Sequence, residues 1–442
     1  MRFSEASLFL IRENILKHKL YYILFIIVFY FSLTCLSIAQ SPGDLDKTFG
    51  NDGKVNVGIS GYYDVAKSMA LQHDGKIIVV GYGKEALISP KGLSMTRYLQ
   101  NGEMDFEFGN YGVNQRVTTD LEGEAYSVAI QKDNKIVITG YTISPETNNE
   151  NITLLRFTEN GYIDQSFGNK GLIVTEISDK KDESQSVVIQ QDGKIVVLGS
   201  TDHEPTTDIV LIRYDENGSI DYSFGINGIV ITDIKSSMDI GKSIAIQRDG
   251  KLIVSAFTYV GNDFFMTLLR YNTNGDLDPT FGKSGFVVTD INTKRGKMDL
   301  ALQNDGKIIL VGPSEVENSH HFTVLRFNNN GSLDKSFGRN GVTKTIIGNY
   351  SEAESVALDL NGNIVVAGTT ELGIEQFVVA MYNQQGTLVP DFGSGGIVKT
   401  SFIKNSVDRA HSVVIDNIGN IIVAGETEND YTTFGLVKLI GK

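Results

Sequence analysis

Short apolar segments separated by polar turns follow one another along almost the whole chain. Between residues 186 and 233 the apolar segments are "SVVIQ", "KIVVLG", "IVLIRY" and "GIVITD", and Gly, Asn, Asp or Ser residues flank them. Each segment is short and rich in Val, Ile and Leu, and none shows a helical period, which is typical of β-strands. Several are apolar at consecutive positions, as strands are when both faces of their sheet are covered. The pattern predicts units of four short strands.

The four-strand pattern recurs with a nearly fixed period, which the sequence Phe-Gly-x-x-Gly marks. Successive phenylalanines are 59, 59, 57, 57, 56 and 55 residues apart. A fixed internal period of this size indicates a repeat architecture and replaces the two or three domains that length alone would suggest. The seven phenylalanines are Phe49, Phe108, Phe167, Phe224, Phe281, Phe337 and Phe392. We expect each of them to pack between neighbouring repeats, while the glycines let the chain turn sharply.

Seven such units predict an all-β fold, a seven-bladed β-propeller with four antiparallel strands per blade, over residues 40–442. The first strand after the N-terminal segment, "GKVNV", has no unit before it, and the last, "FGLVKLI", is a third strand with no fourth strand after it. We therefore expect the N-terminal strand to close the last blade. An open solenoid would instead show atypical capping units at its ends.

The turn between the first two strands of each unit can be typed from its residues. Asp-Gly pairs would suit a type I′ hairpin, but the seventh unit would then force Ile418 into the left-handed region. A type I turn followed by one left-handed bulge residue suits all units better, because Gly and Asn tolerate that conformation. The left-handed residue is then Gly75, Asn134, Gly193, Gly250, Gly306, Gly362 or Gly419.

The first 39 residues differ in kind from the repeats. Four basic residues precede the apolar run "LYYILFIIVFYFSLTCLSI", and small residues end it. This order predicts an export signal, residues 1–39, which is cut before Gln40, and hence a secreted or periplasmic protein. An uncleaved membrane anchor formed by residues 20–38 is the alternative, because the run approaches membrane-spanning length. Lipid attachment at Cys35 is a third possibility.

Charge and cysteine content restrict the partners of the cleaved chain. Cys35 is the only cysteine, so stability after cleavage must come from packing and closure of the fold. Four basic and two acidic residues precede Gln40, which leaves 35 basic and 51 acidic residues, a net charge of −16. Such a chain repels nucleic acid and anionic lipid, so we expect no nucleic acid partner and no membrane contact after cleavage. The charges are scattered, as on a solvated surface, and we expect a monomer.

The repeated pattern resembles a known family. The stretch "SVVIQQDGKIVVLG", followed by "LIRYDENGSIDYSFGINGIV", resembles the delta-60 repeat of bacterial exported proteins, and the resemblance covers residues 43–442. It implies a propeller whose molecular function is unknown. The stretch "SVALDLNGNIVVAG" is also similar to the NHL-type propeller repeat, which implies that "SVALD" belongs to the innermost strand of its blade.

Arginine and aspartate recur together in the third strand and the turn after it. Arg97, Arg156, Arg213, Arg270 and Arg326 occupy one position, and Asp105, Asp164, Asp221, Asp278 and Asp334 follow eight residues later. The sixth unit loses both, with Met381 and Val389 in their places. Joint loss indicates a partly buried ion pair, such as Arg213 with Asp221, because either ion alone would be stranded. A basic ligand-binding ring is the functional alternative. In the last unit Lys438 replaces the arginine, and closure of the ring would place it opposite Asp46.

Other motifs fail on residue type or spacing. The stretch "NTNGDLD" at 272–278 begins like a calcium loop, but its twelfth position is Lys283 instead of glutamate. The stretch "SSMDIGKS" at 236–243 ends like a phosphate-binding loop but leads into a strand. His203, His320 and His321 have no evident third zinc ligand. We therefore expect no metal, no cofactor and no catalytic residue, with a calcium ion in any of the turns between third and fourth strands left as an open alternative.

The variable part of each unit is the loop between its second and third strands and the loop that leads into the next unit. Loops that vary on a uniform scaffold usually carry binding, although surface loops also diverge freely. The residues that enter the inner strands at this face are Lys67, Tyr126, Gln185, Lys242, Met298, Glu354 and His411. Our leading hypothesis is a non-catalytic exported binding or scaffold propeller for an extracellular or cell-surface glycan or protein. The alternative is a hydrolase or lyase at the channel mouth, with Glu354 and His411 as acid and base.

Overall fold

A computed structural model describes residues 40–441, apart from 110–112, 116–121, 204–205, 235, 294–295, 317–318 and 372. The chain divides into two compact units, Met1–Ser41 and Pro42–Lys442. Residues 1–39, on which the prediction of an export signal rests, lie outside the described residues. No helix in the described part of the chain is long and apolar enough to span a membrane.

Within the described residues all regular structure is β-strand. Five sheets have four strands each: β6 (Gly123–Ile130), β7 (Ile136–Ile143), β8 (Glu150–Phe157) and β9 (Leu172–Thr175); β10 (Asp182–Ile189), β11 (Ile195–His203), β12 (Thr206–Tyr214) and β13 (Ile229–Thr232); β14 (Asp239–Ile246), β15 (Leu252–Val260), β16 (Asp263–Tyr271) and β17 (Phe286–Thr293); β18 (Asp299–Leu302), β19 (Ile308–Val316), β20 (Ser319–Phe327) and β21 (Val342–Thr345); β22 (Tyr350–Leu358), β23 (Ile364–Glu371), β24 (Glu375–Tyr382) and β25 (Ile397–Thr400).

A sixth sheet of eight strands joins the beginning and the end of the repeat region. It contains β1 (Lys54–Val57), β2 (Tyr63–Leu71), β3 (Ile77–Lys84), β4 (Gly92–Tyr98) and β5 (Val113–Gln115), together with β26 (Val407–Ile415), β27 (Ile421–Glu428) and β28 (Thr432–Leu439). Strand β1 runs antiparallel to β28 over four residue pairs. The link from β28 to β2 is one parallel pair, Tyr63 with Thr432.

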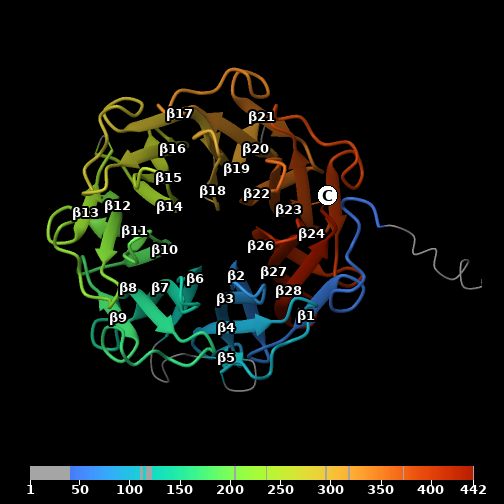
Figure 1. Ribbon diagram of the computed structural model, residues 1–442, viewed down its shortest axis with the longest axis horizontal. Helices are drawn as coiled ribbons and strands as arrows, with labels where there is room; N and C mark the ends of the chain where they lie inside the picture. The colour runs from blue at the N-terminus through green and yellow to red at the C-terminus, as the bar shows by residue number, and fades with distance from the viewer. Residues whose placement is uncertain are drawn as a thin grey trace, which may run out of the picture. The chain divides into compact units, whose positions relative to one another are not determined.

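The sheets of the unit Pro42–Lys442 stand around a central opening, and β2, β6, β10, β14, β18, β22 and β26 lie nearest to it (Figure 1). The prediction of an all-β, propeller-like fold is therefore confirmed. Strand β22 contains the first four residues of the segment "SVALD" and is an inner strand, as the resemblance to the NHL-type repeat implied.

The turns between first and second strands have the predicted conformation. All seven expected residues have positive φ, including the one that is not glycine, Asn134, at 64°. Ile418 is not among the described non-glycine residues with positive φ. The type I turn with a left-handed bulge residue is confirmed, and it fixes the register in which each inner strand meets the second strand.

The hydrophobic core lies between adjacent sheets. All seven repeated phenylalanines are fully buried. Phe224, for example, packs with Val196 and Leu211 of its own sheet and with Ile244 and Val254 of the next sheet. Burial of an aromatic ring at every junction supplies a large part of the apolar area that holds neighbouring sheets together.

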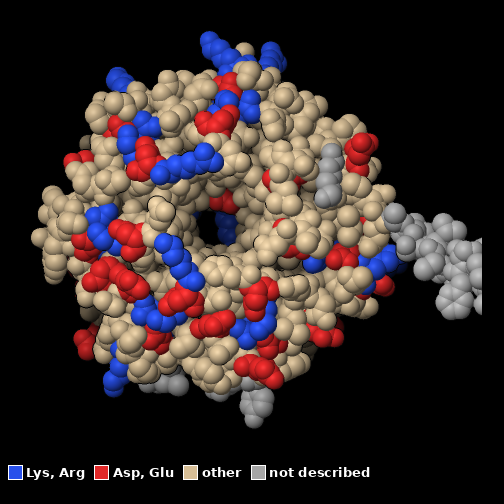
Figure 2. All heavy atoms as spheres, viewed as in Figure 1, with Lys and Arg blue, Asp and Glu red and all other residues tan. Residues whose placement is uncertain are grey.

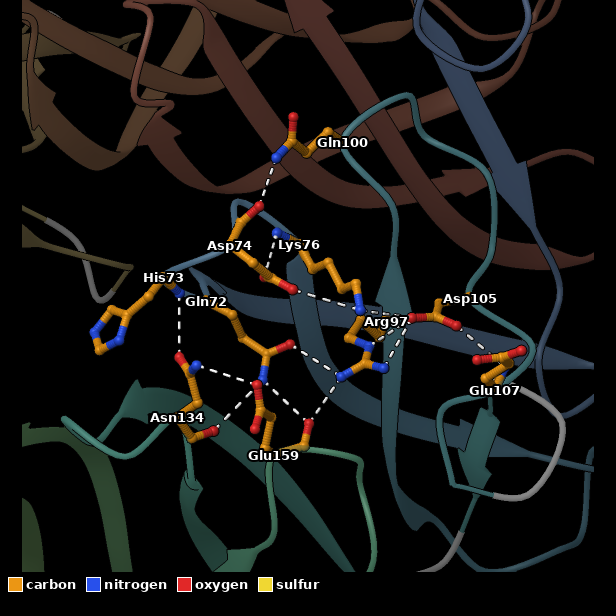
Figure 3. A network of polar contacts seen from close by, with 10 residues as sticks. All are labelled: Gln72, His73, Asp74, Lys76, Arg97, Gln100, Asp105, Glu107, Asn134 and Glu159. Carbon is orange, nitrogen blue, oxygen red and sulfur yellow. Dashed lines mark hydrogen bonds and ion pairs between the residues drawn. The ribbon is translucent and has the colours of Figure 1, made fainter.

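The recurring arginine connects its own sheet to the following one. The Nε of Arg97 donates to Asp105 Oδ2 at 2.9 Å, and its Nη1 donates to the carbonyl oxygen of Glu159 in the next repeat at 2.8 Å (Figure 3). Its guanidinium carbon lies 4.4 Å from the centroid of the Phe108 ring. The arginine, the aspartate and the phenylalanine therefore form one buried junction.

The two exceptional units keep the junction with other residues. Met381 and Val389 are both buried and pack in the apolar cluster that contains Phe392. In the last unit the Nζ of Lys438 lies 3.0 Å from Asp416 Oδ2 and 3.8 Å from Asp46 Oδ2. The lysine thus has Asp416 as its nearer partner, a residue that the repeat pattern did not indicate, in addition to Asp46.

Candidate functional site

A recurring bulge aims one side chain toward the central opening in six of the seven inner strands. In six inner strands the register with the second strand shifts by one residue at the same place. Such a bulge leaves one residue outside the ladder and redirects its side chain. The bulged residues are Lys67, Tyr126, Gln185, Lys242, Glu354 and His411.

These six residues line one cavity, which we call the central cavity. Its volume is about 220 Å³, and the residues after the bulges together with Lys297, Met298 and Asp299 complete its wall. Figure 2 shows the opening, with acidic and basic atoms inside it. The structure therefore brings together all seven residues that the sequence placed at this face, the six bulged residues and Met298.

The residue after the bulge is Ser68, Ser127, Ser186, Ser243, Ser355 or Ser412 in six repeats, and Asp299 holds the equivalent position in the fifth. Some of these residues tie neighbouring inner strands together. Ser127 Oγ accepts a hydrogen bond from the backbone N–H of Val187, and Asp299 Oδ2 accepts one from that of Val356. Asp299 Oδ1 also accepts from Ser243 Oγ at 2.7 Å. The Asp299 carboxylate is thus engaged within the wall, which holds the bulged residues in place.

Glu354 and His411 form a buried pair from adjacent sheets. Their Oε2 and Nδ1 atoms are 2.6 Å apart. Burial raises the pKa of Glu354, but His411, Lys297 and Lys67 outweigh it and lower that pKa to about 2. Burial lowers the pKa of His411 below its ordinary value, and Glu354 only partly offsets this. At neutral pH we therefore assign an ionised Glu354 and a neutral imidazole that donates its Nδ1 proton to it.

The other ring nitrogen of His411 is enclosed. Among the described residues His411 Nε2 is buried with no hydrogen-bond partner, and Glu426 Oε1 is 4.0 Å away. A nitrogen that no solvent reaches is poorly placed to exchange a proton with a ligand in the cavity. The geometry therefore suits a fixed, oriented pair better than a general base.

Three lysines give the central cavity a positive balance. Lys67 and Lys242 come from bulges, and Lys297 enters from the segment just before β18. The Nζ of Lys297 donates to the backbone oxygens of Lys67 at 3.0 Å and His411 at 3.3 Å. Burial lowers the pKa of Lys297 to about 8, although Glu354 opposes the shift, so the amine carries its charge at pH 7. The lining of the cavity thus includes three lysines and two carboxylate residues, Glu354 and Asp299.

Sequence reasoning missed Lys297 and Asp299. It selected Met298, which aligns with the bulged residues of the other repeats, and Met298 does touch the central cavity. However, Met298 is only 3% exposed and packs mainly in the apolar core. One signal could have found Lys297. In the other six repeats the residue before the bulge has a small side chain or none, and it is Ala66, Ala125, Ser184, Gly241, Ala353 or Ala410.

A second group of polar residues lies away from the central cavity. Among the described residues the carboxylates that could share a metal ion are Asp208, Asp233 and Asp239, whose ligand oxygens lie within 4.8 Å of one another. Burial, reinforced by the two neighbouring carboxylates, raises the pKa of Asp239 to about 7. The stretch at 272–278 is different, because its Asp278 bonds Arg270 and Lys251. The side chain of His203 lies outside the described residues.

Comparison with known families identifies the repeat only in general terms. Residues 131–167, 190–224, 247–281 and 303–337 match the sequence model of a family described as a domain of unknown function, DUF5122, beta-propeller. These matches support a propeller-repeat family of unknown function. No curated protein matches the chain.

Solved structures share the fold at low sequence identity. An ulvan lyase of polysaccharide lyase family PL25, bound to -[GlcA(1-4)Rha3S]-, is 11% identical, with 88% of this chain and 96% of that chain covered and a TM-score of 0.51. A protein of unknown function from Dyadobacter fermentans is 11% identical (88% and 98% covered, TM-score 0.47). The β-propeller domain of the Trilobed protease from Pyrococcus furiosus is 10% identical (87% and 95% covered, TM-score 0.47). At 11% identity the likeness to the lyase shows a shared fold alone.

Proposed function

We propose that this chain is a non-catalytic exported binding propeller, whose central cavity takes an anionic group of an extracellular or cell-surface glycan or protein. The observation that carries the proposal is the convergence of Lys67, Lys242 and Lys297 on one cavity. Both carboxylates of that cavity are already engaged, Glu354 by His411 and Asp299 by Ser243 and Val356. The excess positive charge attracts an anion, although the chain as a whole is acidic.

The proposal includes seven blades and a closed ring of the delta-60 type. The eight-stranded sheet counts as two blades, β2–β5 and β26–β28 with β1, because a single residue pair joins them. The pairing of β1 with β28 then makes the N-terminal strand the fourth strand of the last blade. Closure in this way leaves no unpaired sheet edge at the ends of the repeat region, which favours a monomer.

The size and lining of the central cavity favour an acidic sugar over a larger group. About 220 Å³ is below the usual range for a drug-sized ligand, so the cavity suits one terminal residue or one substituent. The ring of Tyr126 lies on the wall, 5.9 Å from the ring of Tyr141. Tyrosine rings offer an apolar face and a hydroxyl, which suits a sugar. The narrow cavity and the acidic surface argue against nucleic acid.

A hydrolase or lyase at the same place is the second candidate. The Glu354–His411 pair beside Lys297 favours it, because a carboxylate-oriented histidine next to a cation is a common catalytic arrangement. The ulvan lyase with a similar fold is a polysaccharide lyase bound to -[GlcA(1-4)Rha3S]-, which makes acidic polysaccharide the first substrate to test. The enclosed Nε2 of His411 is the reason for placing binding first.

A binding assay with matched variants tests the proposal. Residues 40–442 are titrated with acidic and neutral oligosaccharides, and the products are examined for cleavage. We expect acidic oligosaccharides to bind, and Lys67→Met or Lys242→Met to weaken binding roughly 10- to 100-fold, as expected for one charge-assisted contact. The control Lys404→Met changes an exposed lysine by the same charge and leaves binding unchanged. Equal binding of neutral oligosaccharides contradicts the proposal, and cleavage that depends on His411 replaces it with the enzymatic alternative.

A further inference from the structure

The fifth inner strand departs from the pattern that the other six share. Strand β18 has four residues, whereas the other inner strands have eight or nine. It begins only at Asp299, so Lys297 precedes the strand. At the equivalent position the other six repeats carry Ala, Gly or Ser, which are too short to reach into the opening.

Lys297 crosses the central opening to reach other sheets. Its Nζ lies 3.0 Å from the backbone oxygen of Lys67 in β2 and 3.3 Å from that of His411 in β26. It also lies 3.8 Å from Glu354 Oε2 in β22. One amine therefore contacts three inner strands other than β18, including β2 and β26, whose shared eight-stranded sheet does not neighbour the sheet of β18 (Figure 1).

The oxygens that Lys297 contacts are those of bulged residues. A bulged residue is left outside the ladder, so its carbonyl group needs another donor or a cation when it lies inside the protein. Two carbonyl oxygens and a carboxylate are also the ligand types that a hard metal cation such as Ca²⁺ selects. The ammonium group of Lys297 supplies positive charge and donors at the same point.

We propose that Lys297 is a built-in cation, which occupies the place of a free metal ion among the bulge oxygens and makes the central cavity selective for anions. This inference rests on the proposed function for the identity of the ligand, but the arrangement of Lys297 can be tested without any ligand. An ion that is part of the chain cannot dissociate or be chelated. Below the pKa of Lys297 the cavity therefore keeps this positive charge whether or not metal ions are present, unlike a cavity that depends on a bound metal ion.

Removal of the ammonium group should turn its place into a metal site. In Lys297→Ala the carbonyl oxygens of Lys67 and His411 and the carboxylate of Glu354 lose their shared cation. Alanine fits the backbone there, because four other repeats carry alanine at this position, Ala66, Ala125, Ala353 and Ala410. Lys297→Met is the second variant, which keeps most of the side-chain volume. The matched control is Lys242→Met, which removes another lysine of the same cavity.

Calorimetric titration with Ca²⁺ of chelator-treated residues 40–442 tests the inference. We expect Lys297→Ala and Lys297→Met each to bind one Ca²⁺ more per chain than the unchanged protein, with a dissociation constant of at most about 1 mM. The gain should disappear in Lys297→Ala/Glu354→Gln and be absent in Lys242→Met. No gained Ca²⁺ in folded Lys297 variants, or a gain that survives Glu354→Gln, overturns the inference.

A second titration separates this inference from the proposed function. With an acidic oligosaccharide as the probe, the affinity of Lys297→Ala should be at least roughly 10-fold lower than that of the unchanged protein in the presence of a chelator, and Ca²⁺ should restore it. The affinity of the unchanged protein should not depend on Ca²⁺. If the unchanged protein binds no acidic oligosaccharide, the proposed function fails, and the count of gained Ca²⁺ still decides the inference. If it binds and Ca²⁺ restores nothing to Lys297→Ala, the role of Lys297 in anion selectivity is wrong.

Discussion

The buried junction between sheets predicts strong coupling between Arg213 and Asp221. The Nε of Arg213 lies 2.7 Å from Asp221 Oδ2, and its Nη1 donates to Thr273 O at 2.6 Å. Its guanidinium carbon lies 4.5 Å from the Phe224 ring centroid. The sixth repeat shows that Met381 and Val389 can fill the same two positions without charge. The substitutions Arg213→Met and Asp221→Val therefore reproduce an arrangement that the fold already accepts.

The contacts of Arg213 and Asp221 give the size of the expected loss of stability. Arg213→Met strands Asp221 and removes the donor of Thr273 O, and loss of one partner of a buried pair costs about 3–5 kcal/mol. Lys194 stays 2.9 Å from Asp221 and holds the cost near the lower end, about 3 kcal/mol. The double variant leaves the Thr273 carbonyl without its donor, at about 1 kcal/mol. Lys194 and Ser223 lose Asp221 as a partner but are partly or fully exposed and can bond water instead. The double variant should thus be more stable than Arg213→Met alone by about 2 kcal/mol.

Urea denaturation of residues 40–442 and of the two single variants and the double variant measures this difference. Midpoints are compared at equal slopes, so that each shift reports stability and not a change in the unfolded chain. Double-variant stability equal to the sum of the single losses, within about 0.5 kcal/mol, would show that the two residues act independently. The paired-ion account of the recurring arginine would then be wrong.

Three further predictions concern closure, the acidic group and export. Deleting residues 40–57 removes β1 and should lower the melting temperature of the whole domain and produce oligomers in size-exclusion chromatography. Deleting residues 40–41 should have neither effect. A monomer with an unchanged melting temperature after the longer deletion contradicts closure by β1. Asp239→Asn should raise the melting temperature at pH 8 but not below pH 4, because the raised pKa of Asp239 makes its charged form costly only at higher pH; an equal effect at both pH values refutes this. N-terminal sequencing should find Gln40 first, and Met1 on a membrane-bound form would establish the anchor instead.

Local patterns in the sequence predict most of the fold. The alternation of apolar segments and turns predicts the strands, and the Phe-Gly-x-x-Gly period predicts where each repeat begins. The left-handed turn residue follows from the tolerance of glycine and Asn134 for positive φ. The six bulged residues of the central cavity could be selected because repeats align their equivalent positions, and equivalent positions of a ring face a common centre.

Features that depend on exact register or on one irregular repeat escape this reasoning. Lys297 enters the cavity because β18 begins late, and no periodic pattern shows a missing half of a strand. Asp208, Asp233 and Asp239 lie near the ends of separate strands; β12 and β13 pair in one sheet, and only the packing of β14 from the next sheet brings Asp239 to the other two carboxylates. Asp416, the nearer partner of Lys438, comes from a turn with a conformational role of its own.

The most direct test of the central claim compares one ligand in two charge states. A short uronic-acid-terminated oligosaccharide and its methyl ester, which differ in one negative charge, are titrated into residues 40–442. The account predicts that the acid binds at least roughly 10-fold more tightly than the ester and that Lys67→Met with Lys242→Met removes the difference. Equal affinity for acid and ester, or a difference that persists without the two lysines, would contradict an anion-binding central cavity.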